Sequence, residues 1–148
     1  MSFFRQIMAR RAFVCGIFAA GLLLGSVPVR AADEFPFDRE LVLDAAPMRP
    51  GKRMPMLTVA ANGDASIDLW CKSVAAHVEV ADAAIRIEPG LLPEALPEMM
   101  GNGQCTPQRI QADLDLLNAM TDATVWRNQG GALVLEGPKI LKFKPASN

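Results

Sequence analysis

The sequence is poor in the residues from which catalytic and metal sites are commonly built. Its 148 residues include one histidine, His77, and three cysteines, with no C-x-x-C pair. One imidazole is too few for a histidine-rich metal site, and no nucleophile–base pair or cluster of carboxylates stands out beside it. We therefore predict no catalytic residue, no metal site and no cofactor, and we expect a protein that is not an enzyme.

Methionine is more frequent, with eight residues in the chain. Because Cu(I) favours thioether ligands, this number of methionines raises the alternative of a copper site. The sequence has no Met-x-x-Met cluster and no histidine–methionine pairing to support that alternative. We interpret the methionines as fillers of irregular gaps in the core.

Acidic residues are missing from the first 32 positions. This stretch has a positively charged start, an apolar run at residues 12–27 and Val29-Arg30-Ala31, which fits the small-x-small rule of signal peptidases. The pattern predicts a secretory signal at residues 1–31, cleaved between Ala31 and Ala32. A retained membrane anchor is the alternative, but the run of about 16 residues is shorter than the roughly 20 that span a bilayer. We expect a periplasmic or secreted protein with no stable membrane span after cleavage.

Long basic runs are also missing. Four of the 15 basic residues precede Ala32, so the 117 residues after the signal carry 11 basic and 16 acidic side chains, a net charge of −5. This balance argues against nucleic acid or anionic lipid as a partner. An envelope protein is the partner class that we expect, and the sequence indicates no oligomeric state.

Removal of the signal removes Cys15 and leaves two cysteines, Cys71 and Cys105. Two thiols in an exported domain predict a disulfide. It would close a segment of 34 positions, which chain-entropy reasoning values at about 4 kcal/mol. The alternative is a reactive or metal-binding thiol, for which His77 is the one available histidine.

The order of residues predicts a mainly β fold. Asn62-Gly63 separates two alternating apolar runs, which is a strong hairpin signal. Thr106-Pro107 is a typical helix start, with a hydroxyl N-cap followed by proline. We expect a small antiparallel β-barrel or half-barrel of about seven or eight short strands, with one α-helix covering an opening.

The same pattern divides the chain after the signal into three parts. Residues 32–39 are expected to be a flexible N-terminal tether, because they show no strand or helix pattern. Residues 40–145 carry the strands and the helix of the folded domain. Residues 146–148 are expected to be an exposed tail.

Strand parity assigns side chains to the faces of the predicted sheet. In the run Ser66–Cys71, alternation places Cys71 toward the core and Trp70 outward. We therefore predict that Trp70 is exposed and forms a contact patch with the apolar connection at residues 89–104. The same rule places His77 on an outer, polar face, where a solvated histidine is expected.

The predicted helix carries an apolar stripe of Ile110, Leu114 and Leu117. At about 100° per residue, Asp113 lies within the same arc. Such a carboxylate commonly accepts hydrogen bonds from loop N–H groups or pairs with an arginine, which makes it a structural buried acid. The alternative is a site acid with a raised pKa, although no second catalytic partner is visible. We predict the structural role for Asp113.

Several short motifs follow one another in a distinctive order between Glu40 and Lys144. They are Trp70-Cys71-Lys72, Cys105, the helix positions Asp113, Leu116, Leu117 and Met120, then Trp126, Gly130-Gly131 and Leu133-Val134-Leu135. In this order the chain resembles the META domain family, which includes the heat-shock protein HslJ. The family has Gly-Cys-Asn at the first motif and usually glutamate at the helix acid, so this chain keeps the cysteine and an acid but changes their neighbours.

The resemblance implies a small exported or envelope-attached bacterial protein, linked to heat shock, envelope stress and, in some members, drug resistance. It supplies no catalytic residues. The leading hypothesis is therefore a non-enzymatic META/HslJ-like domain that binds an envelope protein or supports stress tolerance. The alternative is a small-ligand-binding barrel in the periplasm, which would need a roomy interior.

Overall fold

The computed structural model describes residues 34–49 and 51–147 of the chain. The predicted signal, residues 1–31, and its cleavage site between Ala31 and Ala32 lie outside the described residues. Within the described part, no helix is both long and apolar enough to cross a bilayer.

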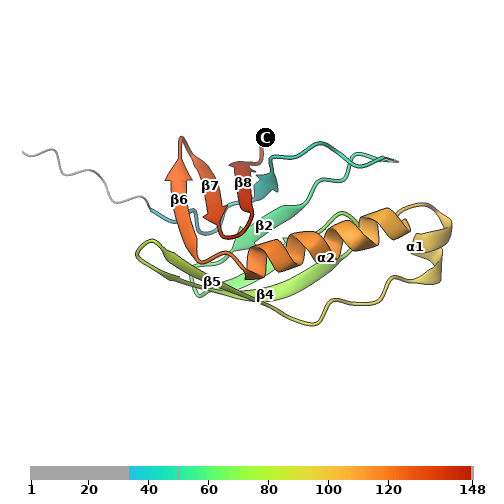
Figure 1. The fold of residues 1–148 in the computed structure, drawn as a ribbon, viewed down its shortest axis with the longest axis horizontal. Coiled ribbons are helices and arrows are strands. Elements are labelled where there is room, and N and C mark those ends of the chain that lie inside the picture. Colours follow the sequence, from blue (N-terminus) through green and yellow to red (C-terminus); the bar gives the residue numbers. More distant parts are fainter. Residues whose placement is uncertain (1–33, 50, 148) are drawn as a thin grey trace, which may run out of the picture. The chain divides into compact units, whose positions relative to one another are not determined.

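Eight strands form one antiparallel sheet, in which each strand pairs with its neighbours in the sequence (Figure 1). β1 also pairs with β8, which closes the ring. The strands are β1 (Leu41–Leu43), β2 (Met56–Val59), β3 (Asp64–Asp68), β4 (Ser73–Ala81), β5 (Ala84–Pro89), β6 (Val125–Gln129), β7 (Ala132–Glu136) and β8 (Ile140–Pro145). The ring is uneven, because β5 and β6 pair only at Ala84 and Val125. The prediction of a mainly β, antiparallel barrel or half-barrel is confirmed.

Two helices lie between β5 and β6. The longer one, α2 (Pro107–Thr121), begins at the predicted residue, and the Thr106 hydroxyl at its N-cap accepts the Arg109 N–H at 3.3 Å. The other, α1 (Pro97–Gly101), is a short helix in the connection at residues 89–104, where the sequence predicted none. In Figure 1, α2 runs beside β4 and β5, and α1 adjoins its first turn.

Alternation along the strands fills the ring with apolar side chains. In β5, for example, Ile85 and Ile87 are buried between exposed neighbours. Apolar side chains at or below 1% exposure include Leu41, Leu57, Val59, Ile67, Ile87, Leu133, Leu135 and Phe143. The interior of the described barrel is therefore occupied by its own side chains.

The predicted hairpin at Asn62-Gly63 joins β2 to β3. Gly63 has a φ of 90°, and a Cβ atom at this position would lie 2.7 Å from the carbonyl oxygen of Val78. Both facts require glycine here, because other residues rarely adopt this φ and their Cβ would collide with β4.

The segment expected to be a flexible tether is packed on the core in its described part, residues 34–39. Phe35 is 5% exposed and meets Trp126 in a T-shaped arrangement, with ring centroids 5.1 Å apart. The Asp38 N–H donates to the Val59 carbonyl oxygen at 2.7 Å. The tether prediction was wrong because it relied on missing periodicity, whereas burial of a single aromatic ring is enough to fix an irregular segment.

The inward face of α2 differs from the predicted stripe. Leu117 is buried as expected, but Leu114 is 42% exposed and Ile110 is only half buried. The buried positions are Arg109, Asp113, Leu116, Leu117, Ala119 and Met120. Hydrogen bonds compensate the burial of the two charged residues, Arg109 and Asp113, on this inward face. Leu114 points to solvent instead.

Candidate functional site

The connection between β3 and β4 is a tight turn, and it decides where Trp70 points. β3 ends at Asp68, and the Leu69 N–H donates to the Lys72 carbonyl oxygen at 2.7 Å. Trp70 is therefore not part of a strand, so strand parity does not apply to it. It is 6% exposed and belongs to the core, which overturns the prediction of an exposed contact residue.

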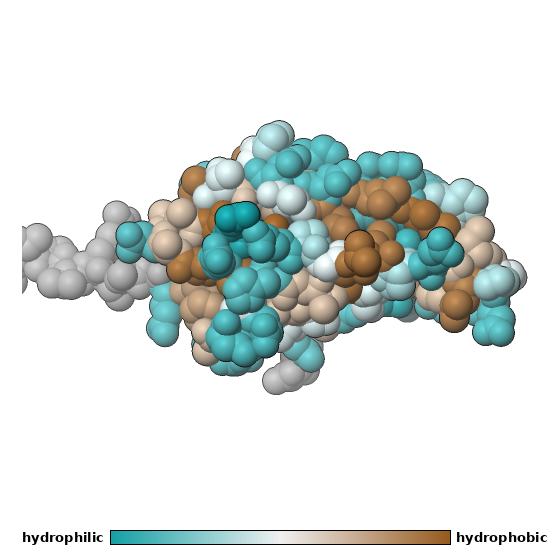
Figure 2. All heavy atoms as spheres, turned by 90° about the horizontal axis from the view of Figure 1, so that it is seen from below, coloured by the Kyte–Doolittle hydropathy of each residue, from teal (hydrophilic) through white to brown (hydrophobic). Residues whose placement is uncertain are grey.

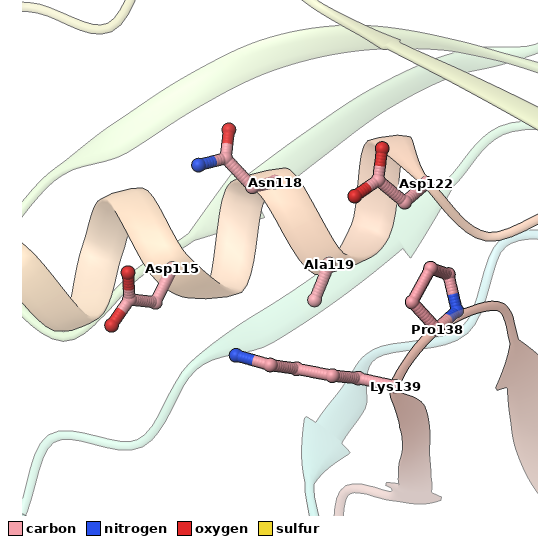
Figure 3. Close-up of a pocket in the computed structure, with 6 residues that line it drawn as sticks. All are labelled: Asp115, Asn118, Ala119, Asp122, Pro138 and Lys139. Carbon is pink, nitrogen blue, oxygen red and sulfur yellow. The ribbon is translucent and has the colours of Figure 1, made fainter.

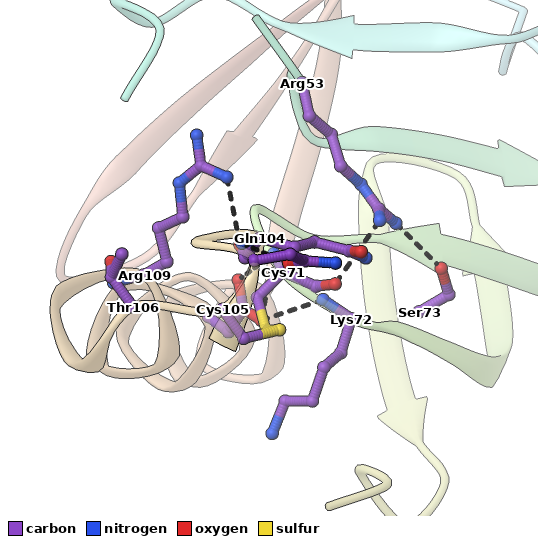
Figure 4. The surroundings of a disulfide bond; sticks show 10 residues. Arg53, Cys71, Lys72, Ser73, Gln104, Cys105, Thr106 and Arg109 are labelled. Carbon is purple, nitrogen blue, oxygen red and sulfur yellow. Dashed lines mark hydrogen bonds between the residues drawn. A yellow bond between two sulfur atoms is a disulfide. The ribbon is translucent and has the colours of Figure 1, made fainter. Parts of the chain in front are cut away.

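A disulfide between Cys71 and Cys105 joins this turn to the residue that precedes the N-cap of α2 (Figure 4). The two Cα atoms are 5.0 Å apart, and neither cysteine has exposed surface. The predicted pairing is confirmed. Its effect is to connect the β3–β4 turn covalently to the start of the helix.

Asp113 of α2 connects to the same turn without a covalent bond. Its carboxylate has no exposed surface and accepts the backbone N–H groups of Cys71 and Lys72, each at 3.1 Å. Burial raises the pKa of Asp113 above its ordinary value of 3.8, while the backbone N–H groups of the turn and the nearby Lys72 charge act in the opposite direction. Asp113 thus has the contacts of a structural buried acid, because its carboxylate accepts hydrogen bonds from the backbone N–H groups of the turn.

Two arginines add hydrogen bonds around this region (Figure 4). Arg53 donates to the Cys71 carbonyl oxygen at 3.3 Å and to the Ser73 hydroxyl at 3.0 Å. Arg109, which is 3% exposed, donates to the carbonyl oxygens of Gln104 and Met48 at 2.9 and 2.6 Å. Three of these four contacts are to backbone carbonyl oxygens, so the two arginines connect separate segments of the backbone, which is a structural role.

The connection from Gly90 to Gln104, here named the strap, is fixed at both ends. The Gly90 N–H donates to the Ala75 carbonyl oxygen at 2.8 Å, and the next residue after the strap, Cys105, carries the disulfide. None of the strap residues is buried. Three large apolar side chains on it are exposed: Leu91 at 98%, Leu96 at 57% and Met100 at 44%.

The strap is the part of the predicted contact patch that the structure leaves on the surface. It appears in yellow below α2 in Figure 1. Figure 2, which views the molecule from that lower side, shows hydrophobic residues next to hydrophilic ones on this face. The exposed apolar surface therefore comes from the strap and not from Trp70.

A surface hollow of about 160 Å³ lies near the end of α2, against the turn between β7 and β8 (Figure 3). It is lined by Asp115, Asn118, Ala119, Asp122, Pro138 and Lys139. The carboxylates come from one face of the helix, and the single lysine comes from the opposite wall. Sequence reasoning missed this hollow, because residues of α2 and the β7–β8 turn meet only in the folded domain.

His77 is exposed on β4, and its Nδ1 lies 3.8 Å from the carboxylate of Asp64. In the described residues, no three histidine, cysteine or acidic side chains lie close enough together to hold a metal ion. Comparison of the chain with protein-family models, with curated proteins and with solved structures finds no match in any of the three.

Proposed function

We propose that this chain is an exported, non-enzymatic META/HslJ-like domain that binds another protein of the cell envelope through the strap. The observation that carries the proposal is the exposure of Leu91, Leu96 and Met100 on one short segment. Exposed apolar side chains gathered on one short segment indicate an interaction site more often than single ones scattered over a surface. Burial of one such side chain in an interface contributes about 1.5–3 kcal/mol.

The two attachments of the strap support this role. A free loop of 15 residues would lose much conformational entropy on binding, which would weaken the complex. The hydrogen bond at Gly90 and the disulfide at Cys105 restrict the strap before any partner arrives. A segment that is restricted yet unburied is suited to present side chains to another molecule.

Export is proposed on two grounds. The first 31 residues have the pattern of a secretory signal, and a buried disulfide is favoured in oxidising compartments such as the periplasm. A role in tolerance of envelope stress follows from the resemblance to the META family and belongs to the same proposal. The acidic balance of the chain after the signal argues for protein, rather than nucleic acid, as partner.

Ligand carriage inside the barrel is less well supported. The interior positions are filled by side chains such as Leu57 and Phe143, which are at most 1% exposed. The hollow beside α2 holds about 160 Å³, which is below the roughly 300–1,000 Å³ of common small-molecule pockets. We therefore favour protein binding at the surface.

The test is capture of partners from a native envelope extract by three oxidised baits: the unchanged protein, Leu91→Ser/Leu96→Ser, and Ile140→Ser. Ile140 is 68% exposed on β8, so its variant removes exposed apolar surface away from the strap. We expect one stoichiometric partner with the unchanged and Ile140→Ser baits, and its loss with the strap variant. A partner that all three baits retain equally would overturn binding through the strap.

A further inference from the structure

The surface formed by the strap, α1 and α2 has a single sign of charge. From Leu91 to Val125 the exposed charged residues are Glu94, Glu98, Asp115 and Asp122. The one basic residue in this stretch is Arg109, which is 3% exposed and turned toward backbone carbonyl groups. We name the exposed residues of the stretch 91–125 the acidic face.

The acidic face also carries most of the exposed apolar side chains in the described chain. Six large apolar side chains are exposed among the described residues, and five of them lie between residues 91 and 125: Leu91, Leu96, Met100, Leu114 and Val125. In Figure 1 the strap runs below α2. Exposed carboxylates and exposed apolar side chains are thus interspersed along this stretch.

The acids of this face form no ion pairs with the described residues, whereas acids elsewhere are paired in some cases and unpaired in others, as at Glu40 and Glu79. Glu88, Glu136 and Asp44 are paired with Arg86, Arg127 and Lys144. Glu94, Glu98 and Asp122 form no such pair, and Asp115 accepts a hydrogen bond only from the neutral side chain of Gln111 at 3.0 Å. Lys139 borders the face across the hollow from Asp115, and the Lys72 charge lies near Asp113 of α2.

We propose that the acidic face docks a cationic amphipathic segment of the partner protein, in which lysine or arginine alternates with leucine-like side chains. This inference rests on the proposed function and names the chemistry of the partner. Apolar side chains of the segment would cover Leu91, Leu96 and Leu114, and its cations would supply the pairs that the four carboxylates lack. Complementary charge speeds encounter and rejects acidic competitors, and its effect is largely screened beyond a Debye length of about 8 Å at physiological salt.

The test is a fluorescence-anisotropy titration of the oxidised protein, expressed from residues 1–148 and purified after export. Three labelled synthetic peptides of equal length serve as probes: a lysine–leucine amphipathic peptide, its glutamate–leucine counterpart and a lysine–serine peptide. We expect binding of the first only, weakened about tenfold by raising the salt concentration from about 0.05 to about 0.3 M, because added salt shortens the Debye length and screens the charges.

Matched variants separate charge from fold. Glu94→Gln/Glu98→Gln should lower the affinity for the lysine–leucine peptide about tenfold. Glu40→Gln/Glu79→Gln, which removes two exposed acids elsewhere, should change this affinity less than about twofold. Thermal unfolding followed by circular dichroism verifies that each variant keeps its fold. Leu91→Ser/Leu96→Ser should lower the affinity for the same peptide by a similar factor.

Each other outcome overturns a definite part of the account. Equal binding of the glutamate–leucine peptide, equal binding of the lysine–serine peptide, or unchanged affinity in Glu94→Gln/Glu98→Gln would overturn the cationic amphipathic partner. If no peptide binds while capture from the envelope still depends on Leu91 and Leu96, the same inference fails and the proposed function stands. If capture is also independent of these leucines, both fail.

Discussion

The Asp113 carboxylate accepts the backbone N–H of Cys71, a residue that lies 42 positions earlier in the chain, at 3.1 Å. Cys71 is also bonded through its sulfur to Cys105, just before the same helix. The β3–β4 turn is therefore attached to α2 twice, once by a hydrogen-bonded carboxylate and once by a disulfide. This double attachment holds the helix, and with it the end of the strap, against the barrel.

Asp113→Asn should destabilise the domain. The amide offers one acceptor oxygen in place of two and turns an NH₂ group toward backbone donors, so at least one buried N–H loses its partner. We expect the free energy of unfolding, measured in urea, to fall by about 1–3 kcal/mol. Asp115→Asn on the exposed side of the same helix is the control and should change stability by less than about 0.5 kcal/mol. An equal effect of the two variants would contradict the structural role of Asp113.

Stability should also carry a pH signature of Asp113. Its pKa in the folded protein is raised above 3.8 by burial, so the folded state holds this proton more tightly than the unfolded state. The contribution of the group to stability is therefore fully present below pH 3.8 and is lost as pH rises through the folded-state pKa. The stability difference between the unchanged protein and Asp113→Asn should therefore shrink as pH rises above about 4, because only the unchanged protein loses this contribution. A difference that grows over this range would show that the pKa is lowered instead.

The disulfide should be complete in the exported protein. Thiol titration of the folded, exported protein should detect neither Cys71 nor Cys105 until a reductant is added, because both are paired and without exposed surface. Cys71→Ser/Cys105→Ser should lower the free energy of unfolding by about 4 kcal/mol, the value expected for a closed segment of this length. Two titratable thiols in the natively folded protein would be incompatible with this account.

Trp70→Ser should unfold or strongly destabilise the domain. Trp70 is 6% exposed in the core, and loss of a large buried aromatic ring costs about 3–5 kcal/mol. Leu91→Ser is the natural comparison, because that side chain is 98% exposed and its loss should leave the melting temperature unchanged. The two melting curves, followed by circular dichroism, distinguish a core residue from a surface one. If the Trp70→Ser protein were as stable as the Leu91→Ser protein, Trp70 would be a surface residue and not part of the core.

Phe35→Ala should likewise destabilise the domain, by about 3 kcal/mol or somewhat more. The ring is 5% exposed and packs against Trp126 with centroids 5.1 Å apart. Intrinsic tryptophan fluorescence should change with the same substitution, because the contact to one of the two tryptophans is lost. Unchanged stability and fluorescence would mean that residues 34–39 are a tether after all.

Local patterns predicted the parts of the fold that depend on neighbours in sequence. The Asn62-Gly63 hairpin, the helix start at Thr106 and the strand alternation each follow from turn chemistry, capping or parity, and the structure has them all. The pairing of Cys71 with Cys105 followed from elimination, because the third cysteine, Cys15, lies in the predicted signal. These signals act within a few residues or depend on simple counting.

The errors arose where tertiary contacts override local patterns. Parity failed at Trp70 because β3 ends at Asp68 and the chain turns, a boundary that alternation does not mark. Phe35 is ordered by Trp126, which lies far along the chain. Leu114 is exposed because Asp113 takes the inward position, where the N–H groups of a distant turn compensate its burial.

Binding through the strap is the central claim, and site-specific photo-crosslinking in living cells tests it most directly. A photoreactive amino acid replaces Leu91 in one strain and Ile140 in another, since both side chains are exposed at 98% and 68%. We predict one discrete protein adduct on irradiation from position 91 and none from position 140. No adduct at position 91, or the same adducts at both positions, would contradict the account.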